Sequence, residues 1–303
     1  MTIPFIKYSK LMLITSGLVA VLSVFFFLKW GLNAGIDFTG GSLMELSFNK
    51  DRPQVEEVVQ IFKGVQLNDT IVQKTDNNGL IIRTNFVNED THQKILKEVR
   101  DKYQTQDNTI REDRFETVGP SVSQALKQRA WWAVIFVSLG IIAYVAYAFR
   151  QVSRPVASWK YGALAIVALV HDILLVVGVF AVLGHYFGTE VDVGFVVALL
   201  TVLGYSVNDT IVVYDRIREN LIRHSADNFP EVVNNGLNQT LMRSINTTAK
   251  TLLPLVALYF FGGATIHSFV LALLIGIASG AYSSIFIAAP LLVVVEKWQR
   301  RNA

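Results

Sequence analysis

The sequence predicts an α-helical polytopic membrane protein with six transmembrane helices and one extracytoplasmic α+β domain between the first two helices. Composition supports this class: of 303 residues, 52% are hydrophobic and 17% are charged, whereas globular domains carry about 25% charged residues. Apolar runs near the roughly 20 residues that a helix needs to cross a bilayer also recur along the chain.

The first apolar run covers residues 11–28. It is longer than the apolar region of a signal peptide, so we expect an uncleaved transmembrane helix within residues 1–30. Five further spans are predicted at residues 131–149, 161–187, 191–214, 240–261 and 269–295. The span at 240–261 is the least apolar, because it contains Arg243 and Lys250.

The basic residues of the short loops all fall on one side of the six predicted spans. By the positive-inside rule that side is cytoplasmic and carries both termini. The opposite short loops, residues 184–190 and 262–267, contain no Lys or Arg. The basic residues are Lys7, Lys10, Arg150, Arg154, Lys160, Arg216, Arg218, Arg223, Arg243, Lys297, Arg300 and Arg301.

This topology predicts three regions: residues 1–30, an extracytoplasmic domain at 31–130, and residues 131–303 with helices two to six. A cytoplasmic loop is expected at residues 215–239, where an apolar stripe favours a short helix lying at the membrane interface. The stripe comprises Phe229, Val232, Val233 and Leu237.

Within residues 31–130, alternating and helical hydrophobic spacings indicate the order βαββαβ, which is the ferredoxin-like pattern. Strands are expected at 42–48, 69–75, 79–86 and 108–118, and helices at 51–65 and 88–103. Asp51 and Asn88 are the expected N-caps of the two helices.

Two carboxylates fall inside predicted spans. Asp209 lies in the fourth span, and Asp172, preceded by His171, lies near the middle of the third. Intramembrane carboxylates are costly and are usually functional. The alternatives are a structural His171–Asp172 pair and an Asp209 that only marks the end of its span.

Possible partners of Asp209 follow helical spacing. On the fourth span, Thr201, Tyr205 and Asn208 form a polar stripe expected to face the bundle, and on the fifth, Arg243, Thr247 and Lys250 share one side. A nearby cation favours the charged carboxylate and burial favours the neutral one, so switching between paired and unpaired geometry would move a proton. The predicted ion or proton relay is Asp209, Arg243, Asp172, Lys250, Asn208 and Thr247. Arg243 could instead be an anchor reaching the lipid headgroups.

Small residues recur every four positions in the sixth span, including Gly276 and Gly280. Such a stripe allows close helix packing, with a partner helix in this chain or another.

Several function classes are disfavoured. The GxGD turn of an intramembrane aspartyl protease is absent, the five histidines are scattered, and no Walker-type loop is present. We therefore expect no enzyme activity, no metal and no bound cofactor, with a transmembrane ion gradient as the energy source. The basic residues cluster by loop, which disfavours nucleic-acid binding.

Two motifs then become recognisable. Residues 35–41 read GIDFTGG, and residues 204–210 read GYSVNDT and continue to DRIREN at 215–220. Together with His171-Asp172 and Phe261-Gly262-Gly263, they resemble the SecD/SecF family of protein-export subunits, within the resistance-nodulation-division (RND) superfamily. The first motif contributes the signature residues Gly35, Asp37, Gly40 and Gly41.

The chain length and the small outer domain are similar to separate SecF members. The resemblance implies a bacterial inner-membrane subunit that pairs with SecD, associates with the SecYEG channel and with YajC, and uses the proton gradient, or sodium, to promote export after SecA. The family's fourth-span aspartate falls on Asp209 and its fifth-span arginine on Arg243, whereas Lys250 departs from the family pattern. Alternatives are one half of an RND-type exporter of small molecules or lipids, and a structural scaffold of the translocon.

Overall fold

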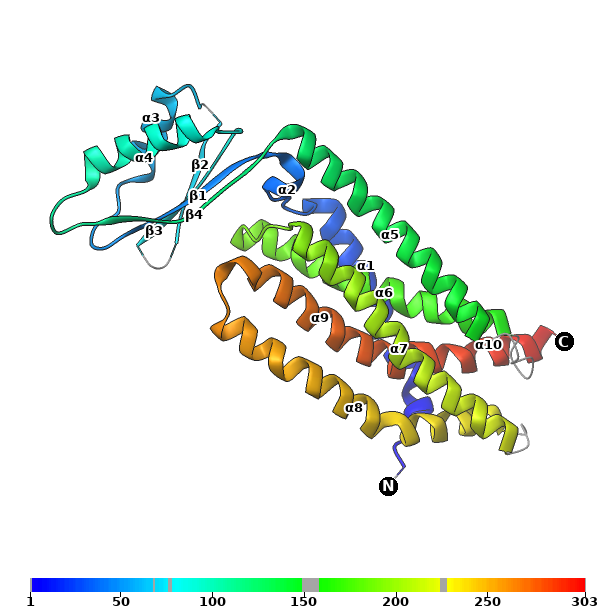
Figure 1. The fold of residues 1–303 in the computed structure, drawn as a ribbon. Helices are drawn as coiled ribbons and strands as arrows, with labels where there is room; N and C mark the ends of the chain where they lie inside the picture. The colour runs from blue at the N-terminus through cyan, green and yellow to red at the C-terminus, as the bar shows by residue number, and fades with distance from the viewer. Residues whose placement is uncertain (1, 68, 76–77, 149–157, 224–227, 303) are drawn as a thin grey trace. The chain divides into compact units, whose positions relative to one another are not determined.

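The computed structural model describes residues 2–67, 69–75, 78–148, 158–223 and 228–302 (Figure 1). The chain forms two compact units. One comprises Met1–Asn33 and Trp132–Ala303, and the other comprises Ala34–Trp131. They are referred to below as the helical unit and the outer unit.

The outer unit follows the order βαββαβ after a one-turn helix, α2 (Ile36–Thr39). Its four strands form one antiparallel sheet in the order β2-β3-β1-β4. Alternate residues of β1 and β3 pack with α3 and α4 in one hydrophobic core, so both helices lie on the same face of the sheet. The elements are β1 (Gly41–Phe48), α3 (Val55–Gly64), β2 (Ile71–Lys74), β3 (Gly79–Thr84), α4 (Glu89–Tyr103) and β4 (Ile110–Val118).

The two expected helix caps in this unit have different outcomes. The Asn88 cap is confirmed, because its side chain accepts a hydrogen bond of 2.9 Å from the Thr91 amide. The Asp51 cap is wrong, since α3 begins only at Val55, after Gln54. Pro53 explains the delay, because a residue before proline is pushed out of the helical region.

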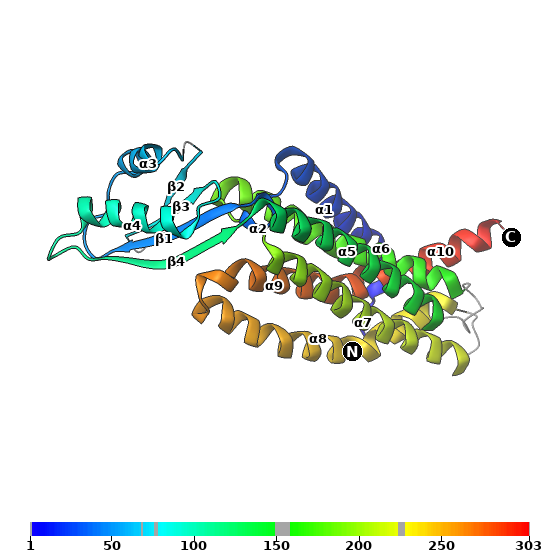
Figure 2. The same cartoon turned by 45° about the horizontal axis from the view of Figure 1, so that its top comes forward.

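The helical unit consists mainly of long helices. After a 3₁₀ turn at Phe5–Tyr8, they are α1 (Ser9–Trp30), α5 (Pro120–Ala148, which begins in the outer unit), α6 (Ser158–Phe187), α7 (Val193–Arg223), α8 (Phe229–Phe261), α9 (His267–Ser283) and α10 (Ala289–Asn302). A short 3₁₀ helix, η3 (Ala264–Ile266), precedes α9, and a π-helical turn, η4 (Ser284–Ala288), joins α9 to α10. In both views α8 and α9 run side by side (Figures 1 and 2).

Among the described residues, five helical segments are long and apolar enough to cross a membrane. They are Phe5–Trp30, Pro120–Ala148, Trp159–Phe187, Val193–Ile222 and His267–Arg301. The charged helix α8 is not among them, so the fifth of the six expected spans, residues 240–261, remains a prediction.

The expected interfacial helix at residues 229–239 is wrong. Residues up to Arg223 continue α7, and α8 begins at Phe229. Phe229, Val233 and Leu237 are fully buried in the main core of the helical unit. Their apolar stripe packs against protein rather than lipid. Arg150 and Arg154, which helped to predict the topology, lie outside the described residues.

The same part of α8 also holds the N-terminal segment. Asn238 bonds both backbone groups of Ile3, accepting from its amide at 2.8 Å and donating to its carbonyl at 2.9 Å. Asn234 donates to the same carbonyl and accepts from the Ile6 amide. These contacts, with the buried Phe5 ring, attach the start of α1 to α8.

Helices α7 and α9 pack closely through the small residues of α9. A Cβ atom on Gly276 would lie 2.2 Å from a Val202 methyl carbon, and one on Gly280 would lie 2.9 Å from Ser206 Cβ. One turn further, Ser284 bonds Thr210 through their hydroxyls at 2.8 Å. Three successive turns of the two helices are therefore in register.

We predict that Gly276→Ala lowers the free energy of unfolding by about 1–3 kcal/mol, the usual cost of overpacking. Gly140→Ala is the matched control, since a Cβ there meets no atom within 4 Å. That change should stabilise its helix by roughly 0.5–1 kcal/mol. Thermal unfolding of both variants in one detergent measures the difference, and equal midpoints would contradict the close α7–α9 contact.

Candidate ion site in the helical unit

Asp209 is half-buried on α7 and has two differently placed carboxylate oxygens. Its Oδ1 accepts a hydrogen bond of 2.7 Å from the Ser244 hydroxyl of α8. Its Oδ2 is buried and makes no hydrogen bond with a described residue, although Ser284 and Arg243 lie close enough to interact with the carboxylate. Ser244 thus positions one oxygen, and the other oxygen has no hydrogen bond with a described residue.

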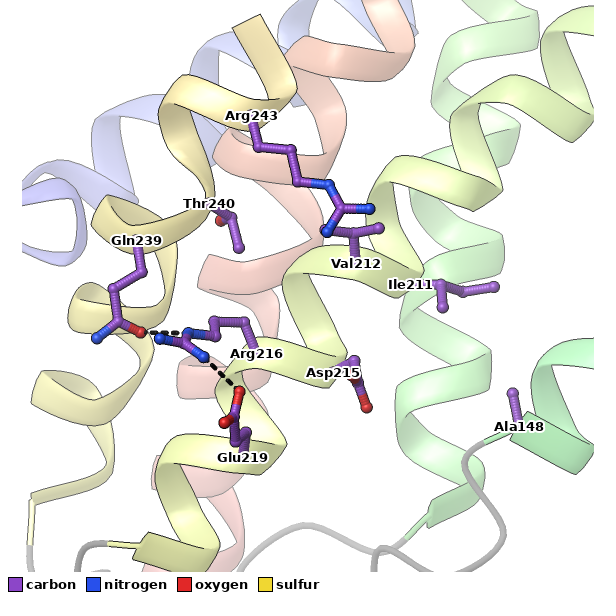
Figure 3. Close-up of a pocket in the computed structure, with 9 residues that line it drawn as sticks. All are labelled: Ala148, Ile211, Val212, Asp215, Arg216, Glu219, Gln239, Thr240 and Arg243. Carbon is purple, nitrogen blue, oxygen red and sulfur yellow. Dashed lines mark hydrogen bonds and ion pairs between the residues drawn. The ribbon is translucent and has the colours of Figure 1, made fainter. Parts of the chain in front are cut away.

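A cavity of about 440 Å³ lies between α7, α8 and the end of α5. Its lining residues are Ala148, Ile211, Val212, Asp215, Arg216, Glu219, Gln239, Thr240 and Arg243. Figure 3 shows Arg243 reaching from α8 toward α7, with its guanidinium beside Val212. Arg216 bonds Gln239 at 2.7 Å and pairs with Glu219 (Figure 3). Four of the nine lining residues are charged, and one of them, Arg243, also lies close to the Asp209 carboxylate.

The polar stripe expected on α7 does not face this chain's own bundle. Thr201 and Asn208 are exposed, and Tyr205 is half-buried with a long hydrogen bond of 3.4 Å to Thr251. The buried polar residues of α7 at this level are Ser206 and Thr210 instead. The register of α7 against the small residues of α9 determines this orientation, and it brings the small hydroxyls inward.

The expected Asp209–Lys250 pair is also wrong within this chain. Lys250 is exposed on α8 and makes no ion pair with a described residue. Thr247 is exposed too, and its hydroxyl donates to the Arg243 carbonyl of its own helix at 2.8 Å. Of the expected α8 partners, Arg243 alone lies near Asp209, and the partner that bonds it, Ser244, was not singled out.

Asp172 lies at a separate buried site where three helices meet. It is fully buried on α6 and accepts three hydrogen bonds of 2.6 Å, from Ser206 on α7 and from Ser279 and Ser283 on α9. His171 Nδ1 lies 3.3 Å from the same carboxylate. We call Ser206, Ser279 and Ser283 the serine cage. Sequence reasoning missed it, although the serines of the sixth span sit at helical spacing.

The two carboxylates are linked through adjacent residues. Ser283 donates to Asp172, and Ser284, the next residue, lies close to Asp209 and bonds Thr210. These serines mark the start of the π-helical turn η4. Such turns inside α-helices are frequently found at functional sites.

The glycine motif at residues 35–41 belongs to the outer unit. Gly40 and Gly41 have φ angles of +74° and +115°, which favour glycine. A Cβ on Gly41 would lie 2.5 Å from the Thr84 carbonyl oxygen. Gly35 is buried and its carbonyl accepts from the Thr39 hydroxyl, while Asp37 is half-buried in α2. The paired glycines thus allow β1 to begin directly against the end of β3.

Residues 98–298 match the family model described as "Protein export membrane protein SecD/SecF, C-terminal". Residues 25–51, which contain the paired glycines, match the model "SecD/SecF GG Motif". The chain belongs to the SecD/SecF family. As a SecD/SecF protein with several membrane-length helices, it is a polytopic membrane protein.

Individual relatives of this SecD/SecF chain are similar over almost its full length. Protein translocase subunit SecF of Thermobaculum terrenum is 41% identical, over 99% of this chain and 95% of the relative. SecF of Haemophilus influenzae is 38% identical, over 94% and 83%. The crystal structure of SecDF from Thermus thermophilus, a translocon-associated membrane protein, is 30% identical with a TM-score of 0.82. This chain covers 39% of that protein and is itself covered to 98%.

Proposed function

We propose that this chain is the SecF-type subunit of a Sec protein translocase. Paired with SecD, it uses a transmembrane proton or sodium gradient to promote late steps of protein export across the bacterial inner membrane. The observation that carries the proposal is Asp209, a carboxylate in a membrane-length helix. Ser244 holds one of its oxygens, the other oxygen has no hydrogen bond with a described residue, and Arg243 lies close by.

This arrangement suits reversible loading of an ion. The Ser244 hydrogen bond fixes the carboxylate. The Oδ2 atom, which has no hydrogen bond with a described residue, is the position for a proton or a small cation. Arg243 favours the empty, charged form when it is close, and a proton or cation replaces that interaction when Arg243 moves away. A gradient supplies about 2.3 kcal/mol per charge per 100 mV, enough to bias such a cycle.

Exposed polar residues on α7 and α8 support pairing with a second membrane subunit. Thr201 and Asn208 on α7, and Thr247 and Lys250 on α8, are exposed in the interior of long helices. A lysine facing lipid at the centre of a helix costs about 2.5–3.5 kcal/mol. Because SecDF of Thermus thermophilus is much longer than this chain, we infer that a SecD half covers these residues. The same covering would allow α8 to cross the membrane as the predicted fifth span, which completes the six.

The further partners follow from this assignment. The SecD–SecF pair would associate with the SecYEG channel and with YajC, and would act on exported chains after SecA. We assign a ferredoxin-like fold to the outer unit, supported by its βαββαβ order and the sheet order β2-β3-β1-β4. With both termini cytoplasmic, this unit lies outside the cytoplasm, where it can contact emerging polypeptide.

Lys250→Leu is expected to weaken the pairing with SecD, because the ammonium loses its partner groups across the interface. We predict that the amount of SecD recovered with the chain falls at least about tenfold, equivalent to 1.4 kcal/mol. Lys10→Leu, an exposed lysine near the start of α1, is the matched control. Equal recovery of SecD with both variants would show that Lys250 does not face the partner.

The proposed function is tested by export into membrane vesicles that lack this chain and SecD. Restoring both proteins should accelerate late export when a proton or sodium gradient is imposed, and should lose that effect when an ionophore dissipates the gradient. Acceleration that is equal with and without a gradient would favour a structural scaffold. Gradient-driven efflux of a small molecule or lipid, without any effect on export, would indicate an exporter half.

A further inference from the structure

We propose that His171 and Asp172 form a second proton site, in which the pair holds one exchangeable proton inside the serine cage. The role of this proton in transport rests on the proposed function. Its presence does not, because it follows from the contacts around Asp172 alone.

The buried Asp172 carboxylate needs a compensating positive charge or a proton. Asp172 has no exposed surface, and its three serine donors are neutral hydroxyls. Its ion-pair partner among the described residues is His171. An uncompensated buried charge costs several kcal/mol, so such groups are normally paired or neutralised. Neutrality at this site therefore requires one extra proton.

The contacts of the two Asp172 carboxylate oxygens indicate where that proton lies. A carboxylate offers about four lone-pair positions. The Oδ2 atom of Asp172 accepts from Ser206 and Ser283, and Oδ1 accepts from Ser279 and faces His171 Nδ1. All four positions therefore face groups that can donate, and a proton on the carboxylate would require one serine hydroxyl to turn from donor to acceptor. The proton fits on the imidazole, which is the fourth donor.

The second ring nitrogen of His171 is the atom at which the proton exchanges. His171 Nε2 is buried and makes no hydrogen bond with a described residue. It loses or gains its proton while Nδ1 keeps facing Asp172. The Tyr282 ring stacks on His171 with centroids 6.4 Å apart, and its hydroxyl bonds Ser16 of α1 at 2.9 Å. This unpaired nitrogen therefore lies near the contact of α6, α9 and α1.

Other ionisable groups around the cage do not replace His171. Tyr282 on α9 stacks on the imidazole, and Asp209 lies three residues beyond Ser206 on α7. Asp209 is itself a carboxyl group, which is neutral or negative and never positive, so it cannot neutralise Asp172. On α1, the nearby polar group is the neutral Ser16 hydroxyl. A proton on His171 is the compensation that these groups leave available.

A sodium ion is the competing occupant, because a carboxylate and three hydroxyls are also oxygen ligands for a hard cation. The geometry favours the proton. Each cage serine is placed to donate to Asp172 at 2.6 Å, and the fourth position faces a nitrogen donor rather than another oxygen.

The test is nuclear magnetic resonance of ¹³C- and ¹⁵N-labelled histidines in the full-length chain, paired with unlabelled SecD in lipid nanodiscs. The sequence has five histidines, and loss of one signal in His171→Gln assigns His171. We expect a cationic His171 at neutral pH and, in Asp172→Asn, a proton affinity at least tenfold weaker. Asp192→Asn, a carboxylate change at the start of α7, should leave the His171 titration unchanged.

Two results would overturn the proposal: a neutral His171 in the unaltered protein, or the same titration in Asp172→Asn. A sodium-dependent loss of the His171 proton at constant ionic strength would also overturn it, in favour of a cation site. If Asp172→Asn does not fold, the unaltered protein still decides. Export is not part of this readout, so failure of the proposed function would leave the result intact.

Discussion

Asp209→Asn is expected to abolish the gradient-dependent part of protein export and to leave the protein folded. The amide oxygen can still accept the 2.7 Å hydrogen bond from Ser244, so the α7–α8 contact is retained. The amide cannot bind or release a proton, and it lacks the charge that attracts Arg243 or a cation. Export should therefore fall to the rate measured without a gradient.

The size of this loss depends on the gradient. One charge moved through 100 mV contributes about 2.3 kcal/mol, and each 1.4 kcal/mol corresponds to a tenfold change. Export in vesicles with an imposed potential measures the effect. Asp192→Asn is the matched control, because Asp192 accepts from the Phe195 amide at 2.8 Å and asparagine caps helices equally well. A normal gradient response in Asp209→Asn would rule out Asp209 as the loading point.

Asp172→Ala should cause a large loss of stability. The change removes the shared acceptor of Ser206, Ser279 and Ser283, and so breaks contacts that join α6, α7 and α9. Hydrogen bonds between membrane helices average about 0.6 kcal/mol and reach about 1.7 kcal/mol. Three such bonds to a buried carboxylate give an expected loss of roughly 2–5 kcal/mol.

A series of variants separates the cage from a general effect of mutation. Ser206→Ala, Ser279→Ala and Ser283→Ala should each cost less than Asp172→Ala, since each removes one donor. Thr15→Val should cost almost nothing, because that hydroxyl is exposed and bonds its own helix. Reversible unfolding in detergent measures each free energy. If Asp172→Ala unfolds like Thr15→Val, the cage does not hold the three helices together.

Much of the outer unit could be predicted from local sequence. Alternating apolar residues and the Asn88 cap follow from short-range chemistry, and both agree with the structure. The Asp51 cap failed because the restriction imposed by Pro53 on its predecessor outweighed the capping preference of aspartate. The interfacial helix at residues 229–239 failed for a tertiary reason, since its apolar side packs against Phe5, Tyr214 and Ile217.

The candidate site was predictable only in part. Charged residues in apolar runs pointed to Asp172, Asp209 and Arg243, because such residues stand out in composition. The serines that bond the carboxylates do not stand out, since serine is common in membrane helices. Their role depends on the α7–α9 register, where Gly276 lies against Val202 and Gly280 against Ser206. Lys250 could not be placed, because its surroundings depend on a second subunit.

The central claim is that Asp209 loads the ion that drives export, and ion flux tests it most directly. The chain and SecD are reconstituted in liposomes containing a pH-sensitive or sodium-sensitive dye, and a membrane potential is imposed. The unaltered protein should carry a proton or sodium flux that Asp209→Asn lacks and Asp192→Asn retains. Equal flux in the unaltered protein and Asp209→Asn would contradict the claim.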